Sequence, residues 1–389
     1  MYYASLRHFS HTINTPSPRT HSSNQLNRRS LTRYTACILT SDGAVIESTA
    51  STRDPVINYN MVLNLASLDA PRPFSLKATA LSHGWHECSP MSWSEGGRCF
   101  QTIERDGERV FRVSVVEEPA KSSSGIRLRV TIEGPTSDGI VAQIQDRLRA
   151  TLSLDRDLTE FYALCTEHPR LAVIPRIAGG RLLRSPSMTE NILKALCSTN
   201  VNWTQAVKMI NRIGQLGPIV PHFRNLTAWP TPREILRAGE TYLSQVCRLG
   251  YRVPAILEFC ADVCDGRFDP ESLITQAADP ATSSDDLLAQ LRSIQGIGPS
   301  SAHYLLGFLG RHDRLSIDTA TVAHVAATHT EGRKPTLQQI ERIYAPYGRW
   351  KNLVYWCENW LTWETAKQIV READSNPRTD RSRRSQSRA

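Results

Sequence analysis

A Gly-x-Gly turn and a lone aspartate stand out in the segment "IQGIGPSSAHYLLGFLGRHDRLSIDTATV". Gly296 and Gly298 permit a tight chain reversal, and the proline that follows suits the first turn of a new helix. Main-chain N–H groups around Gly298, Ser300 and Ser301 would then point outward from the helix N-terminus, an anion site suited to a phosphate of DNA. A plain corner between two helices explains the turn as well.

Asp318 precedes the helical pattern "TATVAHVA", and a role as helix N-cap would by itself account for it. The same position would surround the carboxylate with amide donors and the positive end of the helix dipole, which favour its ionised form. An ionised carboxylate held near a sugar stabilises oxocarbenium-like charge and helps to orient or activate water. Cleavage of an N-glycosidic bond needs this chemistry.

The first half of the chain predicts an antiparallel sheet with one solvated face. Residues 74–134 read as strands, and "IRLRVTIE" alternates apolar and polar residues with a period of two. Asp106 and Gly107 lie between two β-like runs, which is a strong signal for a hairpin.

From about residue 138 the patterns become helical, and no repeat of fixed period is present. Three pairs of residues have the spacing of a helix-capping box: Ser187 with Glu190, Thr231 with Glu234, and Ser283 with Asp286. The predicted class is α+β, a small antiparallel sheet domain followed by a bundle of short helices.

Composition bounds the class of protein. The 389 residues, 40% hydrophobic and 22% charged, suit two or three globular domains, and no apolar run is long enough to span a membrane. The net charge of +8 lies mainly in the two tails, so it favours a polyanionic partner only mildly. Nine scattered cysteines argue against a secreted disulfide scaffold and favour reduced thiols.

We therefore divide the chain into an extension over 1–60, a sheet domain over 61–150, a helical domain over 151–368 and a disordered basic tail over 369–389. The extension is rich in Ser, Thr, Asn and Arg, and its first acidic residue is Asp42. A transit peptide, a disordered tail and a start codon placed upstream of Met61 all fit it.

The hairpin, the Gly/Pro-rich loop and the aspartate together resemble the signature of the helix-hairpin-helix DNA glycosylase superfamily. "LDRDLTEFYAL" followed by "GGRLLRSPSMTENILKALCSTNVNW" is similar to 8-oxoguanine DNA glycosylases, as are "RLGYRVPAIL" and "YAPYGRWKNLVYW". These stretches occur in the family's order over roughly residues 75–365. The resemblance implies two helical layers that enclose a cleft, and extrusion of a damaged base from duplex DNA into a pocket.

The resemblance also assigns residues to DNA binding. Asn200 in "CSTNVNW" would enter the duplex near the orphaned partner base, and Tyr251 and Arg252 in "LGYR" would wedge and hydrogen-bond at the gap. Without the family, Asn200 reads as a helix terminator, and the other two as a surface pair on a turn.

Main-chain carbonyls of Arg292, Ile294 and Ile297 would match the family's site for a monovalent cation, K⁺ or Na⁺. No other cofactor is expected. An iron–sulfur cluster needs four closely spaced cysteines after the helical domain, where this chain has only Cys357.

The chain departs from bifunctional 8-oxoguanine glycosylases at their catalytic lysine, which forms a Schiff base with the sugar. Ser300 occupies that position, and no lysine occurs between Lys208 and Lys334. We therefore expect a monofunctional enzyme in which Asp318 assists attack by water and leaves an abasic site, as in bacterial 3-methyladenine glycosylases.

For the base pocket, the resemblance points to His83 and Gly84, and Tyr304 lies one helical turn beyond Ser300. Trp350 and Trp356 are candidates for stacking, although aromatic residues at this spacing are commonly core. Aromatic walls suit cationic alkylated purines, whereas a hydrogen-bonding backbone at Gly84 suits an oxidised purine. The sequence leaves both open.

Two alternatives remain: a bifunctional 8-oxoguanine glycosylase/AP lyase and a non-catalytic lesion-binding protein. Damaged double-stranded DNA is the expected partner of a monomer, and no RNP or KH pattern favours RNA. A bacterial cytoplasmic location is expected if Met61 is the true start, and a nucleus or organelle otherwise.

Overall fold

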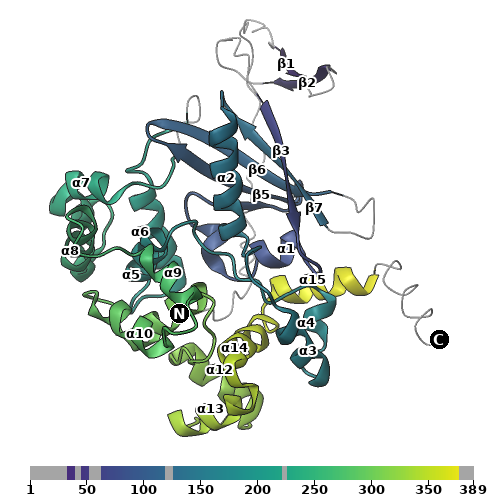
Figure 1. The fold of residues 1–389 in the computed structure, drawn as a ribbon, viewed down its shortest axis with the longest axis vertical. Helices are drawn as coiled ribbons and strands as arrows, with labels where there is room; N and C mark the ends of the chain where they lie inside the picture. The colour runs from purple at the N-terminus through teal and green to yellow at the C-terminus, as the bar shows by residue number, and fades with distance from the viewer. Residues whose placement is uncertain (1–32, 40–44, 52–62, 119–125, 221–225, 376–389) are drawn as a thin grey trace, which may run out of the picture.

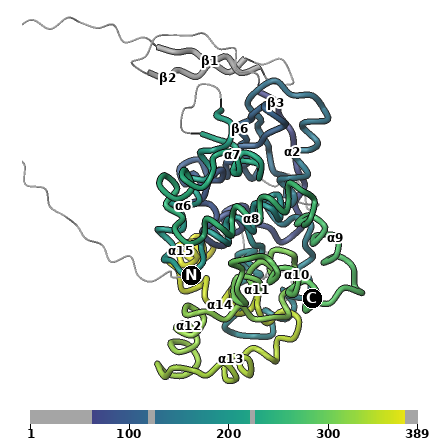
Figure 2. Tube along the Cα trace, turned by 90° about the vertical axis from the view of Figure 1, so that its left-hand side faces the viewer, coloured from purple at the N-terminus to yellow at the C-terminus, as the bar shows by residue number. Residues whose placement is uncertain are grey.

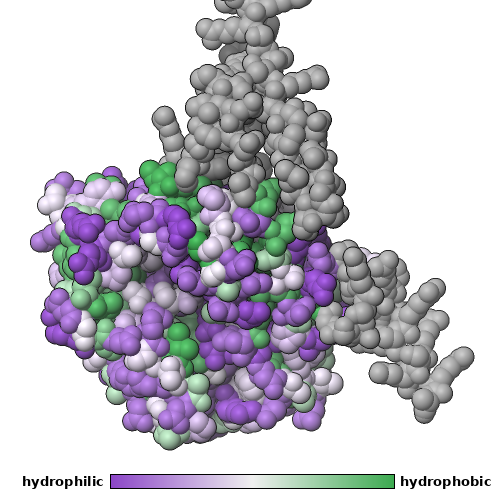
Figure 3. Space-filling view, turned by 45° about the horizontal axis from the view of Figure 1, so that its top comes forward, coloured by the Kyte–Doolittle hydropathy of each residue, from purple (hydrophilic) through white to green (hydrophobic). Residues whose placement is uncertain are grey.

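A computed structural model describes residues 33–39, 45–51, 63–118, 126–220 and 226–375. Strand β1 (Arg33–Leu39) pairs antiparallel with β2 (Val45–Ser51) inside the predicted N-terminal extension, most of which lies outside the described residues. Among the described residues, no helix is both long and apolar enough to cross a membrane. The face drawn in Figure 3 is mostly hydrophilic, with hydrophobic residues in small areas.

The main sheet has five antiparallel strands in the order β3-β7-β6-β5-β4. Their bounds are β3 (Leu63–Ala70), β4 (Ser92–Ser94), β5 (Cys99–Asp106), β6 (Arg109–Glu117) and β7 (Ile126–Glu133). The alternation predicted for β7 is confirmed, because Leu128, Val130 and Ile132 are all buried. The predicted hairpin is confirmed too. Asp106 pairs with Arg109, and Gly107 in the turn has a φ of +60°.

Helix α2 (Asp138–Thr151) lies across one face of this sheet (Figure 1). Ile140, Ile144 and Leu148 share a core with sheet residues such as Val113 and Val130. The short α1 (Leu76–Ala80) and the 3-10 turn η1 (Gly84–Glu87) connect β3 to β4. The end of the sheet at which β3 is labelled lies opposite α12 and α13 in both Figure 1 and Figure 2.

The remaining chain is helical. Its elements are α3 (Thr159–Glu167), α4 (Val173–Arg176), α5 (Met188–Cys197), α6 (Trp203–Gly214), α7 (Pro232–Gln245), η2 (Gly250–Arg252), α8 (Val253–Cys264), α9 (Ser272–Ala278), α10 (Ser284–Ser293), α11 (Pro299–Phe308), α12 (Thr319–His329), α13 (Leu337–Tyr344), η3 (Ala345–Trp350), α14 (Lys351–Trp360) and α15 (Glu364–Ser375). The sheet followed by helices confirms the predicted α+β class.

Local signals placed the helix starts correctly. Ser187, Thr231 and Ser283 each accept a hydrogen bond at the N-terminus of the following helix, and the last two form complete capping boxes. One boundary was wrong. Helix α15 continues to Ser375 and buries Ile369, so the predicted tail beginning at 369 starts inside a helix.

The helices are divided between two hydrophobic cores. The first core joins the sheet and α2 to helices α5 to α11, and α6 contributes Met209, Ile210 and Ile213 to it. The second joins α3, α4, α12, α13, α14 and α15. The hairpin between α10 and α11 therefore belongs to one core, and α12, which begins after Asp318, belongs to the other. The eight cysteines from Cys88 to Cys357 are free, and all but Cys264 are buried.

Candidate active site

The α10–α11 hairpin depends on its first glycine. Gly296 has a φ of +84°, and a Cβ there would lie 3.1 Å from Leu196 Cδ2 and 3.2 Å from Ala255 Cβ. Both the backbone conformation and the packing of the turn therefore select glycine at this position.

Gly298 is different, because its φ of −82° suits any residue and a Cβ there would meet nothing within 4 Å. It is the N-cap of α11 and has no side chain with which to cap the helix. The N–H groups of Ser300 and Ser301 in the first turn thus lie at an exposed helix N-terminus, which is suited to an anion. Of the predicted cation ligands, the Ile294 carbonyl accepts a hydrogen bond from Ile297 N–H at 3.1 Å.

Asp318 is the N-cap of α12 and forms a capping box with Thr321. Its Oδ1 accepts the Thr321 N–H at 2.9 Å, and its own N–H donates to Thr321 Oγ1 at 3.2 Å. The Thr321 hydroxyl also lies 3.0 Å from the Tyr355 hydroxyl. Burial, followed by the charge of Asp318, raises the pKa of Tyr355, so this phenol stays protonated beside the carboxylate.

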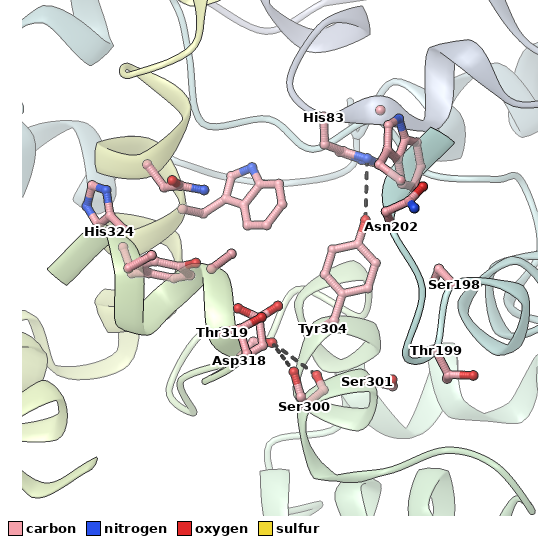
Figure 4. A pocket seen from close by; sticks show the side chains of 18 of the residues that line it. His83, Ser198, Thr199, Asn202, Ser300, Ser301, Tyr304, Asp318, Thr319 and His324 are labelled. Carbon is pink, nitrogen blue, oxygen red and sulfur yellow. Dashed lines mark hydrogen bonds between the residues drawn. The ribbon is translucent and has the colours of Figure 1, made fainter. Parts of the chain in front are cut away.

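A cavity of about 1210 Å³ lies between the hairpin, α12, α14 and η1. Its wall brings together most of the predicted site residues: His83, Gly84, Asn200, Gly296, Ile297, Gly298, Ser300, Ser301, Tyr304 and Asp318. Figure 4 shows Asp318 and Ser300 close to one another on one side, with Tyr304 reaching toward His83 on the other. The Ser316 hydroxyl connects the segment before α12 to α11, because it donates to the Ser300 carbonyl at 3.0 Å.

One wall of the cavity is a hydrogen-bonded aromatic cluster. The Tyr304 hydroxyl lies 3.4 Å from His83 Nδ1 (Figure 4). Trp85, which does not itself line the cavity, donates to the same hydroxyl through Nε1 at 2.7 Å. The other ring nitrogen of His83 contacts the Leu183 carbonyl, so it carries the proton and leaves Nδ1 as the acceptor. Burial holds the pKa of His83 well below its usual range, so this histidine is neutral.

The two tryptophans predicted to stack on a base have separate locations. Trp356 lines the cavity 5.9 Å from the Tyr304 ring. Trp350 does not line it; this ring packs against Phe161 and His312 and borders two smaller cavities. The expected place of Trp350 in the base pocket was therefore incorrect, because it ends η3 whereas Trp356 lies within α14.

Tyr251 and Arg252 lie beside the cavity, around a smaller hollow that shares Thr199 and Gly296 with it. Tyr251 is 65% exposed, and the Arg252 guanidinium stacks 4.5 Å from its ring centroid. Arg252 is itself buried and donates to the carbonyls of Thr199 and Leu249. Asn200 follows Thr199 with a φ of +46° and is exposed.

Sequence reasoning missed several residues of the wall. Trp203 packs so closely on Gly84 that any side chain at the glycine would collide with the indole. Ser316, Tyr355 and Trp363 also line the cavity. Trp203 and Tyr355 lie in the stretches "CSTNVNW" and "YAPYGRWKNLVYW", and Ser316 lies two positions before Asp318, whereas Trp363 had no sequence signal.

Lysine is missing from the residues that line the cavity, all of which are described. Lys194 on α5, close to the aromatic cluster, is fully buried and pairs with Glu190 at 2.7 Å. It also donates to Ser185 Oγ at 3.1 Å and lies 5.0 Å from the centroids of Trp85 and Trp229. Its ammonium group is therefore engaged in the core.

Comparison of the chain with family models and with curated proteins gives no match. Solved structures do match. A 3-methyladenine DNA glycosylase from Archaeoglobus fulgidus aligns with a TM-score of 0.60 and 18% identity, over 75% of this chain and 96% of that one. The fold is that of DNA glycosylases. The 8-oxoguanine glycosylase/lyase of Clostridium acetobutylicum, bound to DNA with cytosine opposite 8-oxoguanine, aligns at 0.55 and 16% identity, over 74% and 92%. Its apo form aligns equally well, at 0.55 and 15% identity, over 77% and 97%.

Proposed function

We propose that this protein is a DNA N-glycosylase that takes a damaged purine out of duplex DNA and hydrolyses its N-glycosidic bond, leaving an abasic site. The proposal rests on one observation: Asp318 and the open N-terminus of the hairpin helix α11 line the same cavity. The first supplies negative charge for a sugar, and the second supplies N–H donors for a phosphate. The likeness in fold to DNA glycosylases supports the same reading.

In the proposed mechanism, Asp318 acts by electrostatics. Its capping box with Thr321 fixes the carboxylate while leaving it on the cavity wall. As the glycosidic bond lengthens, positive charge grows on the sugar, and the fixed carboxylate stabilises that charge and orients the attacking water. A pre-oriented group costs no reorganisation when the charge develops.

The proposed enzyme is monofunctional. A lyase of this fold needs an amine that attacks C1′ and forms a Schiff base. Ser300 occupies the equivalent place on the hairpin, and no lysine lines the cavity among its described residues. Water is then the nucleophile, and the DNA strand stays intact until the abasic site is cleaved by other means.

The cavity wall favours an alkylated, positively charged purine over a neutral one. Tyr304, Trp356 and Trp203 present aromatic surface, which attracts cations through the ring quadrupole. His83 is neutral, because burial holds its pKa well below the usual range, so it adds no opposing positive charge. The Gly84 backbone also lies at the wall, and an oxidised purine remains the second candidate.

We further propose that Tyr251, Arg252 and Asn200 fill the gap left by the extruded base. Tyr251 offers an exposed ring for insertion, and Arg252 is anchored to two carbonyls that hold it against that ring. Asn200 projects from an exposed turn at the rim of the same cavity. Carbonyls of Arg292, Ile294 and Ile297 would bind a monovalent cation beneath the DNA phosphate.

Single-turnover assays on end-labelled duplexes test the proposal. The substrates would carry an alkylated adenine, a deaminated adenine, or 8-oxoguanine opposite cytosine, and each reaction would be divided, with and without hot alkali. Breaks that need alkali are the expected result and would name the lesion. Breaks without alkali, trapped by borohydride, would point to the bifunctional enzyme. Binding without base release on every substrate would point to the non-catalytic lesion reader.

A further inference from the structure

A cluster of two histidines and a glutamate lies away from the hairpin, between α12 and α14. His324, His329 and Glu358 each offer one ligand atom, and these atoms all lie within 4.8 Å of one another. His329 Nε2 is 3.0 Å from Glu358 Oε2, and His324 Nε2 is 3.8 Å from the same oxygen. Two histidines and a carboxylate form a donor set that Zn²⁺ and similar transition-metal ions prefer.

Hydrogen bonding within the cluster does not account for the position of the His324 ring. It is 7% exposed, and its Nε2 has no hydrogen-bond partner among the described residues, because 3.8 Å to the carboxylate is too long. Buried polar atoms are normally paired. An imidazole nitrogen aimed at a carboxylate and a second imidazole, with no bond of its own, is placed to ligate an ion.

The surroundings of the cluster suit a metal ion with one open position. The Tyr344 hydroxyl donates to Glu358 Oε2 at 2.8 Å and would orient the carboxylate as an outer partner. His324 also lines the large cavity, which gives solvent access to the cluster (Figure 4). A water molecule would complete the fourth position.

Binding requires two local adjustments. A tetrahedral zinc ion, with ligand bonds of about 2.0–2.1 Å, brings its ligand atoms to roughly 3.3 Å from one another, so the widest gap must close by about 1.5 Å. His329 Nδ1 now lies 3.5 Å from the guanidinium of the exposed Arg170. With Nε2 bound to the metal, Nδ1 carries the proton, and Arg170 turns away into solvent.

We propose that His324, His329 and Glu358 form a binding site for one transition-metal ion, with Zn²⁺ as its best-suited occupant. The ion would fasten the C-terminal half of α12 to α14. Asp318 caps the other end of α12, six positions before His324, which is about 9 Å along the helix axis. The ion is thus too far away to touch the sugar and has a structural role. This inference does not depend on the proposed glycosylase activity.

The test uses the full chain, stripped with a chelator and then titrated with ZnCl₂ by calorimetry, with Tm measured alongside. We expect one ion per chain and a Tm rise of about 5 °C at a hundredfold excess over Kd. Co²⁺ in place of Zn²⁺ should give the visible absorption of a bound ion. No stoichiometric binding to the wild-type chain would overturn the proposal.

Two variants locate the ion. H324F removes a ligand that makes no hydrogen bond through Nε2, so the metal-free protein should keep its Tm while affinity falls at least about 100-fold. E358Q keeps an oxygen acceptor for Tyr344 but should lose the ion similarly, which retains a test if H324F folds poorly. H168Q, a histidine outside the cluster, is the matched control and should bind normally. Unchanged Zn²⁺ affinity and Co²⁺ absorption in H324F and E358Q would place the ion elsewhere and overturn the proposal.

Discussion

The carboxylate of Asp318 and the backbone N–H of Thr321 are 2.9 Å apart, so the proposed catalytic group is also the N-cap of α12. The two roles can be separated by substitution. Asparagine caps a helix about as well as aspartate, whereas alanine does not cap it at all. Only the charge is needed for the chemistry.

Asp318→Asn should therefore keep the fold and lose base release by at least about 100-fold, the scale of removing one preorganised electrostatic group. Asp318→Ala should lose activity and also about 1 kcal/mol of stability through the missing cap. Single-turnover base release and urea denaturation of both variants measure this. Full activity in the Asn variant would exclude Asp318 from catalysis.

The two hairpin glycines should respond in opposite ways to alanine. Gly296→Ala should destabilise the protein by roughly 1–3 kcal/mol, because a φ of +84° strains an L-residue and the Cβ would press on Leu196 and Ala255. Gly298→Ala meets no atom within 4 Å at a φ of −82°, so stability should not fall.

Although Gly298→Ala should leave stability unchanged, it should weaken DNA binding. A methyl group at position 298 would project where the proposed phosphate approaches the N-terminus of α11, so duplex affinity of the Gly298→Ala variant should fall several-fold. Fluorescence anisotropy with a labelled duplex, at fixed salt, measures the affinity. Wild-type affinity in this stable variant would show that no phosphate binds closely there.

The sequence predicted those features that local chemistry determines. The hairpin at Asp106 and Gly107 and the caps at Thr231 and Ser283 were read correctly, because a few neighbouring residues decide each of them. Asp318 and the glycine turn could be singled out for the same reason. What lay beyond reach was the contact between Trp85 and Tyr304, since 219 positions separate them and only the tertiary fold brings them together.

The misplaced Trp350 has a local cause that is visible only in three dimensions. Gly348 has a φ of +51° and breaks the helical path within η3, so Trp350 lies outside the regular spacing of α14. Its ring turns to His312, while Trp356 reaches the cavity. The misjudged boundary at 368 arose from composition, because the arginine-rich sequence that follows concealed the buried Ile369 of α15.

Tyr304→Phe tests the aromatic wall. The change removes the hydroxyl that accepts from Trp85 Nε1 at 2.7 Å, and Trp85 is only 2% exposed, so the indole N–H would be left unpaired at a cost of about 1–3 kcal/mol. The ring itself remains, so binding of a cationic purine through its π-face should persist. Urea denaturation and base release on alkylated adenine separate the two effects; loss of base release in a folded variant would instead assign the hydroxyl a direct role.

His312 provides a pH test of stability. Burial, followed by the charge of Arg156, lowers the pKa of His312 to about 4 from the ordinary 6.5. The unfolded chain therefore takes up a proton as the pH falls below about 6.5 while the folded chain does not, and stability is lost over that interval down to about pH 4. Other groups, such as Glu104, titrate in the same range, so a variant is needed to isolate the histidine.

His312→Phe is that variant, because His312 Nδ1 is buried without a partner among the described residues and phenylalanine preserves the ring contact with Trp350. The stability of the variant relative to wild type should rise by about 2 kcal/mol between pH 7 and pH 5. Urea denaturation at both pH values measures the difference. An unchanged difference would mean that His312 titrates alike in both states.

Ser300→Lys should convert part of the proposed monofunctional activity into glycosylase/lyase activity. Ser300 lines the cavity beside Asp318, so a lysine there would place its amine within reach of C1′ of a bound sugar. The positive end of the α11 dipole would oppose protonation of this amine, whereas the neighbouring Asp318 carboxylate would favour it. We expect borohydride to trap a covalent DNA complex and alkali-independent breaks to appear, both absent from wild type. The matched change Ser301→Lys, one position further along α11, turns the side chain by about 100° around the helix and should not trap DNA. Trapping by both variants would indicate a loosely held substrate, and trapping by neither would place the sugar away from Ser300.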